Sequence, residues 1–236
     1  MAWRRISYKA VGMCKQNGFT LIESAMVLII VGLLLSGALQ AQELLQGARI
    51  HNQIAFQEGV KGAFLAFQDR YRALPGDFSR ATSSISGATI DGDGNGRIEL
   101  RNWAGTHEDV AAWEHLSHAG FTAQLYTYAG LPGAATAPVS FYNIPLQLAF
   151  DDGYGDPNLP KPARHGLKTG NQIPAAILSA IDRKTDDGNA LSGTFRFSAY
   201  APGGNMPDAT ACYTAATGLW TPNGSNDPNC GAISLF

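Results

Sequence analysis

The sequence predicts an α+β fold, in which one long N-terminal helix packs on a C-terminal antiparallel β-sheet with short helices and long loops. Two observations support this prediction. Apolar residues recur at helical spacing from residue 19 to residue 73, and Leu74-Pro75-Gly76-Asp77 then gives a strong stop signal. Short apolar or alternating runs typical of strands follow in the second half, between segments rich in Gly, Pro, Asn and Asp.

The first part of the helix is apolar on all sides. From Phe19 to Leu39 the only charged residue is Glu23. At 1.5 Å per residue this run makes a helix of roughly 32 Å, enough to span a bilayer core of about 30 Å. We therefore expect residues 19–41 to form a transmembrane half. Residues 42–73, where charged residues alternate with the apolar stripe, should form an amphipathic half.

A basic leader precedes the apolar run. Residues 1–18 contain Arg4, Arg5, Lys9 and Lys15 and no acid, a pattern that keeps the N-terminus in the cytoplasm. An ordinary secretory signal is cleaved after its apolar region. Here the distinctive Gly18-Phe19 junction lies before it, so cleavage at this junction would remove the leader and keep the helix.

The hexapeptide Gly18-Phe19-Thr20-Leu21-Ile22-Glu23, with its basic leader and apolar continuation, resembles the prepilin signature of type IV pilins and type II secretion pseudopilins. This resemblance implies a pilin-like fold, cleavage after Gly18 by a prepilin peptidase and N-methylation of Phe19. It also implies a single-pass bacterial inner-membrane protein with residues 74–236 as a periplasmic head. The subunit would later leave the membrane and join other pilin subunits in a pilus or pseudopilus.

Glu23 needs a partner, because a carboxylate inside a bilayer costs a few kcal/mol. Two partners remain open. The new α-amino group of Phe19 lies four residues away on the same helix face. The resemblance instead implies that Glu23 meets the Phe19 amine of a neighbouring subunit and sets the axial register during assembly.

Charge and cysteine content both fit an exported head. Loss of the four basic leader residues leaves 13 of the 17 basic residues against 19 acidic ones, a net charge of −6, which disfavours nucleic acid as a partner. Cys14 leaves with the leader, so Cys212 and Cys230 form an isolated pair that predicts a disulfide. Two unpaired thiols are the alternative.

An acidic loop opens the head. Asp91-Gly92-Asp93-Gly94-Asn95-Gly96-Arg97-Ile98-Glu99 matches the first nine positions of an EF-hand calcium loop. The predicted Ca²⁺ ligands are Asp91, Asp93, Asn95, the Arg97 carbonyl and Glu99. Position 12 is Asn102 instead of the usual bidentate Glu, which should weaken the affinity. The alternative is a Gly/Asn-rich turn with solvated carboxylates.

Later segments predict short elements. A helix is expected from Thr106, as N-cap, to Gly120, just past its end, and a second helix from Pro174 to about Lys184. The expected strands form a sheet of about four members, with the alternating Thr194–Tyr200 as the clearest case, and are Gln124–Tyr128, Val139–Asn143, Leu146–Phe150 and Thr194–Tyr200.

The sequence contains no GxSxG, HExxH or Walker A motif and no Cys/His pair at catalytic spacing. We therefore expect a structural filament subunit and not an enzyme. Two alternatives remain open: a signal-anchored periplasmic binding module or enzyme that does not polymerise, and a minor-pilin adhesin.

Overall fold

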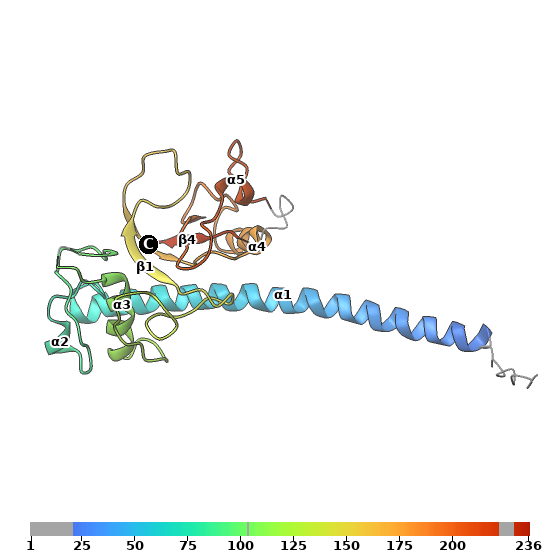
Figure 1. The fold of residues 1–236 in the computed structure, drawn as a ribbon, viewed down its shortest axis with the longest axis horizontal. Coiled ribbons are helices and arrows are strands. Elements are labelled where there is room, and N and C mark those ends of the chain that lie inside the picture. Colours follow the sequence, from blue (N-terminus) through green and yellow to red (C-terminus); the bar gives the residue numbers. More distant parts are fainter. Residues whose placement is uncertain (1–20, 103, 222–228) are drawn as a thin grey trace, which may run out of the picture. The chain divides into compact units, whose positions relative to one another are not determined.

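The computed structural model describes residues 21–102, 104–221 and 229–236. The chain divides into two compact units, residues 1–46 and 47–236. Helix α1, Leu21–Tyr71, contributes to both, and the remaining elements all belong to the second unit (Figure 1). They are α2 (Ala81–Ser84), α3 (Glu108–His118), β1 (Gln147–Asp151), β2 (Arg164–Lys168), α4 (Ala175–Thr185), β3 (Phe195–Phe197), α5 (Ala209–Cys212) and β4 (Ala232–Leu235).

The four strands form one antiparallel sheet in the order β1-β2-β4-β3. Gln147 pairs with Lys168 across β1 and β2, and Gly166 pairs with Leu235 across β2 and β4. A Cβ at Gly166 would lie 2.6 Å from the Ile233 side chain. The absence of a side chain at this position therefore lets β2 and β4 pack closely.

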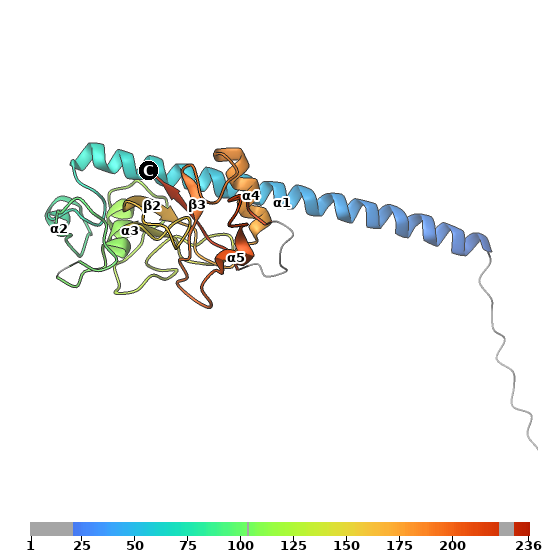
Figure 2. The same cartoon turned by 90° about the horizontal axis from the view of Figure 1, so that it is seen from above.

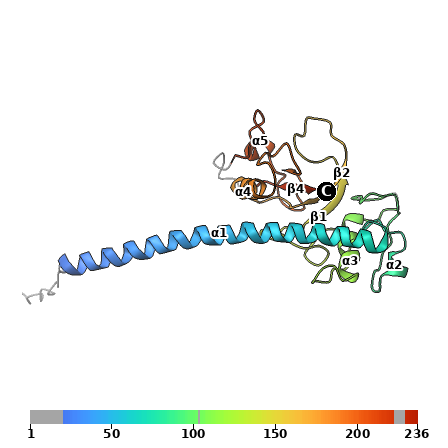
Figure 3. The same ribbon diagram turned by 180° about the vertical axis from the view of Figure 1, so that it is seen from behind.

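The second half of α1 supplies apolar side chains to two cores. In the first core, Phe64 and Phe67 pack with Trp113 of α3 and Leu148 of β1. Both α3 and the sheet lie beside this part of α1 (Figure 2). In the second core, Ile50 packs with residues of α4, β3 and β4, and α4 lies next to β4 (Figure 3). The part of the amphipathic stripe formed by Ile50, Val60, Phe64 and Phe67 is thus buried in the head, whereas Leu44 and Leu45 are exposed.

The predicted α+β, pilin-like class is confirmed, as are several elements. The end of the long helix falls at Tyr71, close to the expected residue 73. Strands β1 and β3 lie within or next to the predicted Leu146–Phe150 and Thr194–Tyr200, and α4 follows Pro174. Gly120 has a φ of +82° just past α3, where a helix commonly ends in the left-handed conformation.

Other local predictions were wrong. Gln124–Tyr128 forms no strand, and Val139–Asn143 contributes only an isolated bridge from Val139 to Pro145. Strands β2 and β4 take the two remaining places in the sheet. The N-cap of α3 is His107 and not Thr106, since the His107 carbonyl oxygen accepts the first helical hydrogen bonds, from the N–H groups of Val110 and Ala111 at 3.2 and 2.9 Å. In the first of these segments the N–H groups of Tyr126 and Tyr128 donate to side chains of α3 at 3.0 and 3.1 Å, so contacts with a helix take the place of strand pairing.

Candidate functional site

The membrane-competent segment lies in the first half of α1. Among the described residues, α1 is the one helix long and apolar enough to cross a membrane. Its large apolar side chains from Leu21 to Leu45 are all exposed, and Glu23 lies in its first turn. The predicted processing residues Gly18 and Phe19 lie outside the described residues. A helix surface this apolar needs lipid or other helices around it.

The predicted calcium ligands do not all face one centre. Both carboxylate oxygens of Asp91 accept hydrogen bonds from Thr82, one from the N–H at 2.8 Å and one from the hydroxyl at 3.0 Å. The Asp93 carboxylate instead accepts from the backbone and side chain of Asn95, at 3.1 Å each. The Asn95 side-chain oxygen accepts from the Arg97 N–H at 2.8 Å. These side-chain oxygens therefore accept hydrogen bonds from the loop itself and from Thr82.

A different acidic cluster forms around Asp93. One carboxylate oxygen each of Asp77, Asp93 and Glu108 lie within 4.8 Å of one another. Asp77 is buried at the turn after α1, and Glu108 is fully buried in the first turn of α3. Burial raises the pKa of Asp77 to about 6 and also raises the pKa of Glu108. Three oxygen ligands of this kind could hold a hard cation.

Backbone groups already engage this cluster. Asp77 accepts from the N–H groups of Asn95 and Gly96, both at 2.9 Å. Glu108 accepts from the Asp93 N–H at 3.0 Å and from the Asn102 amide at 2.9 Å. Asp77 therefore fastens the acidic loop to the turn after α1, and Glu108 fastens it to α3.

Asp77 and Glu108 were not predicted as site residues. The sequence places Asp77 in the stop signal after the long helix and Glu108 in the first turn of the next helix. The structure confirms both positions. Their convergence depends on how the chain doubles back at Gly76, whose φ is +88°. A Cβ at Gly76 would lie 2.3 Å from the Glu108 carbonyl oxygen, so only glycine fits this close approach.

A second acidic cluster lies at the turn between α4 and β3. It consists of Asp182, Asp186 and Asp187, with oxygens within 4.8 Å of one another. Asp182 is fully buried and accepts from the Trp220 indole N–H at 2.6 Å. Burial raises its pKa to about 6. Asp186 accepts from the backbone N–H of Phe195 at 2.9 Å, so this cluster also orders a turn.

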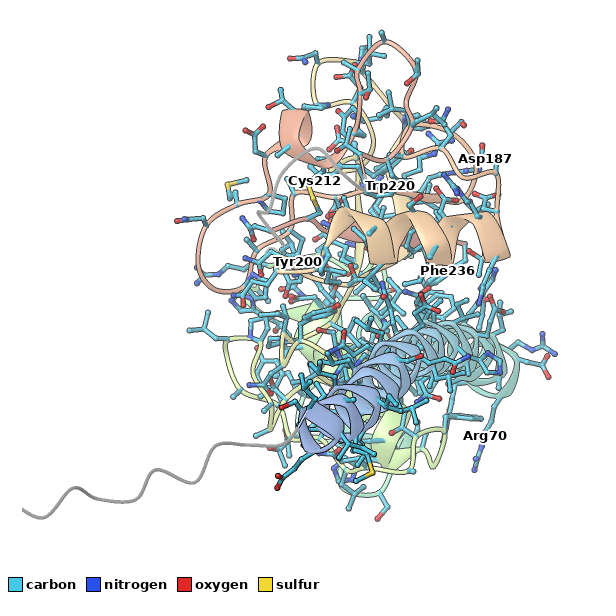
Figure 4. All side chains as sticks on the ribbon, turned by 90° about the vertical axis from the view of Figure 1, so that its right-hand side faces the viewer. Arg70, Asp187, Tyr200, Cys212, Trp220 and Phe236 are labelled. Carbon is cyan, nitrogen blue, oxygen red and sulfur yellow. A yellow bond between two sulfur atoms is a disulfide. The ribbon has the colours of Figure 1, made fainter. Side chains whose placement is uncertain are left out.

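The predicted disulfide is confirmed. Cys212 and Cys230 are bonded, with their Cα atoms 5.6 Å apart and a sequence separation of 18. Figure 4 labels Cys212, which lies in α5 beside the second core. Both cysteines are buried, and the bond ties α5 to the residues that precede β4.

His115 of α3 connects three segments of the head. It is fully buried, its Nδ1 accepts from the Gly76 N–H at 2.9 Å, and its Nε2 lies 2.9 Å from the Ile90 carbonyl oxygen. The ring stacks on Phe67 of α1. This arrangement fixes the tautomer with the proton on Nε2, and burial lowers the pKa of the imidazole. His115 is therefore a structural histidine.

Comparison with known protein families finds a match for one region of the chain. The family model for the prokaryotic N-terminal methylation motif matches residues 13–39. No curated protein and no solved structure matches the chain. The matched segment contains the Gly18-Phe19 junction, Glu23 and the apolar run. Residues 13–39 therefore carry the prepilin signature that is shared by type IV pilins and type II secretion pseudopilins.

Proposed function

We propose that the protein is a structural subunit of a type IV pilus or of a type II secretion filament. A prepilin peptidase would cleave after Gly18, and Phe19 would be N-methylated. The N-terminal helix would anchor the subunit in the inner membrane, with the head in the periplasm, and would later pack with the helices of other subunits. The methylation motif at residues 13–39 carries this proposal.

The exposure of α1 supports the proposal. Its large apolar side chains from Leu21 to Leu45 are exposed in the described part of the chain, so they need lipid before assembly and neighbouring helices after it. The motif points to a structural protein and not to an enzyme. The net charge of −6 after processing also makes nucleic acid an unfavourable partner.

Glu23→Ala tests the assembly role. Under the proposal Glu23 meets the Phe19 amine of a neighbouring subunit, so the variant should insert and be processed but be absent from sheared filaments. Glu43→Ala is the matched control, because Glu43 lies on the same helix and is exposed. Incorporation of the Glu23 variant at the wild-type level would refute this role of Glu23, whereas absence of the wild-type chain itself from sheared filaments would favour an anchored periplasmic module that does not polymerise.

Mass spectrometry tests the processing step. The mature chain should begin at an N-methylated Phe19. An intact Met1, or cleavage after the apolar run, would contradict the filament proposal.

We also propose that the cation suited to the acidic loop is calcium. Its ligands would come from the predicted set Asp91, Asp93, Asn95, Arg97 and Glu99 or from the cluster of Asp77, Asp93 and Glu108. Support comes from the carboxylate-rich composition, since Ca²⁺ takes six to eight oxygen ligands, and from the proximity of the clustered oxygens. Asp93 belongs to both sets, so it is the residue to change first.

A further inference from the structure

Helix α3 carries three buried acidic residues, and one of them differs from the other two. Both carboxylate oxygens of Glu108 and of Glu114 accept hydrogen bonds. Asp109, which is 3% exposed, uses only Oδ2, which accepts from the Gln147 amide at 2.9 Å. Its Oδ1 has no hydrogen-bond partner among the described residues. A buried carboxylate oxygen in this state is costly, and a bound ion or an ordered water commonly accounts for it.

The imidazole of His107 faces this oxygen. His107 is the N-cap of α3, and its Nδ1 lies 3.7 Å from Asp109 Oδ1. This separation is too long for a hydrogen bond. It is close to the separation of two ligands of one metal ion, because bonds of about 2.0 to 2.2 Å at a tetrahedral angle place the ligand atoms about 3.4 Å apart. The His107 side chain is 25% accessible, which leaves an entry path from solvent.

Two further oxygen atoms belong to the same buried cluster. Gln147 of β1 is 4% exposed, and its Oε1 has no hydrogen-bond partner in the part of the chain that the structure describes. The same holds for the hydroxyl of Tyr200, labelled in Figure 4, which lies in the electrostatic field of the Asp109 carboxylate. Amide carbonyl oxygens bind cations directly, and a phenolic oxygen has lone pairs for the same purpose.

The charges around the cluster leave room for a cation. Lys168 lies next to Tyr200, with its Nζ 5.8 Å from the ring centroid, but Lys168 forms an ion pair with Asp151. Its charge therefore offsets that of Asp151 and not that of Asp109. The imidazole of His107 is neutral when one of its nitrogens binds a metal ion. The negative charge of Asp109 is thus left for the ion itself.

The ligand chemistry indicates the class of cation. Calcium and magnesium prefer sites made of oxygen atoms alone. A site that combines an imidazole nitrogen with a carboxylate oxygen suits zinc and the neighbouring transition metals. This site therefore differs in its preferred ion from the acidic loop, although Glu108 of the acidic cluster lies between His107 and Asp109 in the sequence.

We infer that His107, Asp109, Gln147 and Tyr200 form a binding site for a divalent transition-metal cation such as Zn²⁺. His107 Nδ1 and Asp109 Oδ1 are the two main ligands, and Gln147 and Tyr200 supply further oxygens. The ion joins α3 to β1 and to the segment that follows β3. The site is independent of whether the chain polymerises, because all four residues lie in the second unit.

The test uses the untagged, processed full-length protein in detergent micelles, after treatment with a chelator that is then removed. Calcium is kept at millimolar concentration throughout, so that it competes for the acidic clusters. Isothermal titration calorimetry with Zn²⁺ should show one equivalent bound at micromolar concentration, and Co²⁺ should give a visible absorption band on binding. Wild-type protein that binds neither ion at micromolar concentration would overturn the inference.

Variants locate the site. His107→Gln and Asp109→Asn should each weaken Zn²⁺ binding by at least about tenfold, because loss of an outer-shell partner alone costs that much. Tyr200→Phe removes only the hydroxyl and should weaken binding severalfold; unchanged binding would exclude Tyr200 from the site. His51→Gln is the matched control, since His51 is an exposed histidine on α1. Unchanged binding in His107→Gln or Asp109→Asn, or an equal loss in His51→Gln, would refute the site.

Thermal melts separate loss of a ligand from loss of the fold. An ion that binds only the folded state stabilises it, so Zn²⁺ should raise the melting midpoint of wild type and of His51→Gln but not that of His107→Gln. Without metal, Asp109→Asn should still fold, because the new amide keeps an oxygen acceptor for Gln147. A midpoint that Zn²⁺ raises equally in wild type and His107→Gln would place the ion elsewhere. A wild-type midpoint that Zn²⁺ leaves unchanged would favour an ordered water at Asp109 and contradict the inference.

Discussion

Replacement of Phe67 by Ala should detach α1 from the head more strongly than any change on the exposed face of the same helix. The Phe67 ring is fully buried and packs against four other rings at 4.7 to 6.3 Å, those of Tyr71, Phe78, His115 and Phe121. Loss of a buried Phe side chain costs about 3–5 kcal/mol, because the transfer free energy is lost and a cavity remains. The cost should lie at the upper end, since these rings belong to different segments.

The expected change in melting temperature follows from the size of the unit. A unit of roughly 190 residues unfolds with an entropy near 0.4 kcal/mol per degree, so a loss of about 4 kcal/mol lowers the midpoint by about 10 °C. The assay is a near-UV circular dichroism melt of the full-length protein in micelles. Leu65→Ala, at a side chain that is 52% exposed, should shift the midpoint by less than about 2 °C. Equal shifts in the two variants would refute the packing argument.

Three further predictions concern the disulfide, the buried histidine and the acidic loop. Cys212→Ala with Cys230→Ala should lower the free energy of unfolding by about 3 kcal/mol, because the bond closes a loop of about 19 residues; a denaturant titration that matches oxidised wild type would contradict this. Burial lowers the folded-state pKa of His115, so its contribution to stability is full above the unfolded value of about 6.5 and is lost as pH falls below it. A pH series of melts should therefore fall less steeply on the acid side in His115→Asn than in wild type, and parallel curves would count against the assignment. Calcium at about 2 mM should raise stability by roughly 1.8 kcal/mol if Kd is ~10⁻⁴ M; Asp93→Asn should abolish the difference between calcium and chelator, whereas wild-type curves that coincide would leave no role for the metal.

The pH prediction for His115 is separable from the titration of Asp77. Burial raises the pKa of Asp77 from 3.8 to about 6, so its contribution is full below pH 3.8 and is lost as pH rises through about 6. The two groups thus act in opposite directions over overlapping ranges of pH. Comparison of wild type with His115→Asn, and separately with Asp77→Asn, isolates each contribution.

The N-terminal methylation motif and the long helix α1 could be predicted from the sequence because their signals are local. The basic residues before Gly18, the Gly18-Phe19 junction and the apolar run follow one another closely in the sequence. The helix end was also predictable, since Pro75 and Gly76 stop a helix whatever surrounds them. The disulfide needed only a count of the two cysteines that remain after processing.

The sheet and the polar sites could be predicted only in part. Strand β2 contains Arg164, Gly166 and Lys168 and has no strand-like alternation; it becomes a strand because β1 and β4 pair with it on both sides. Backbone pairing between distant segments leaves little trace in either segment alone.

The acidic loop was likewise predicted only in part. The sequence placed Asp93 in a loop of oxygen ligands, but only the folded chain decides which carboxylates approach it. Asp77 lies 16 residues earlier and Glu108 lies 15 residues later, and the three converge because the turn at Gly76 packs against α3. Spacing along a chain determines the contacts within one helix or turn, whereas contacts between segments depend on the packing that buries them.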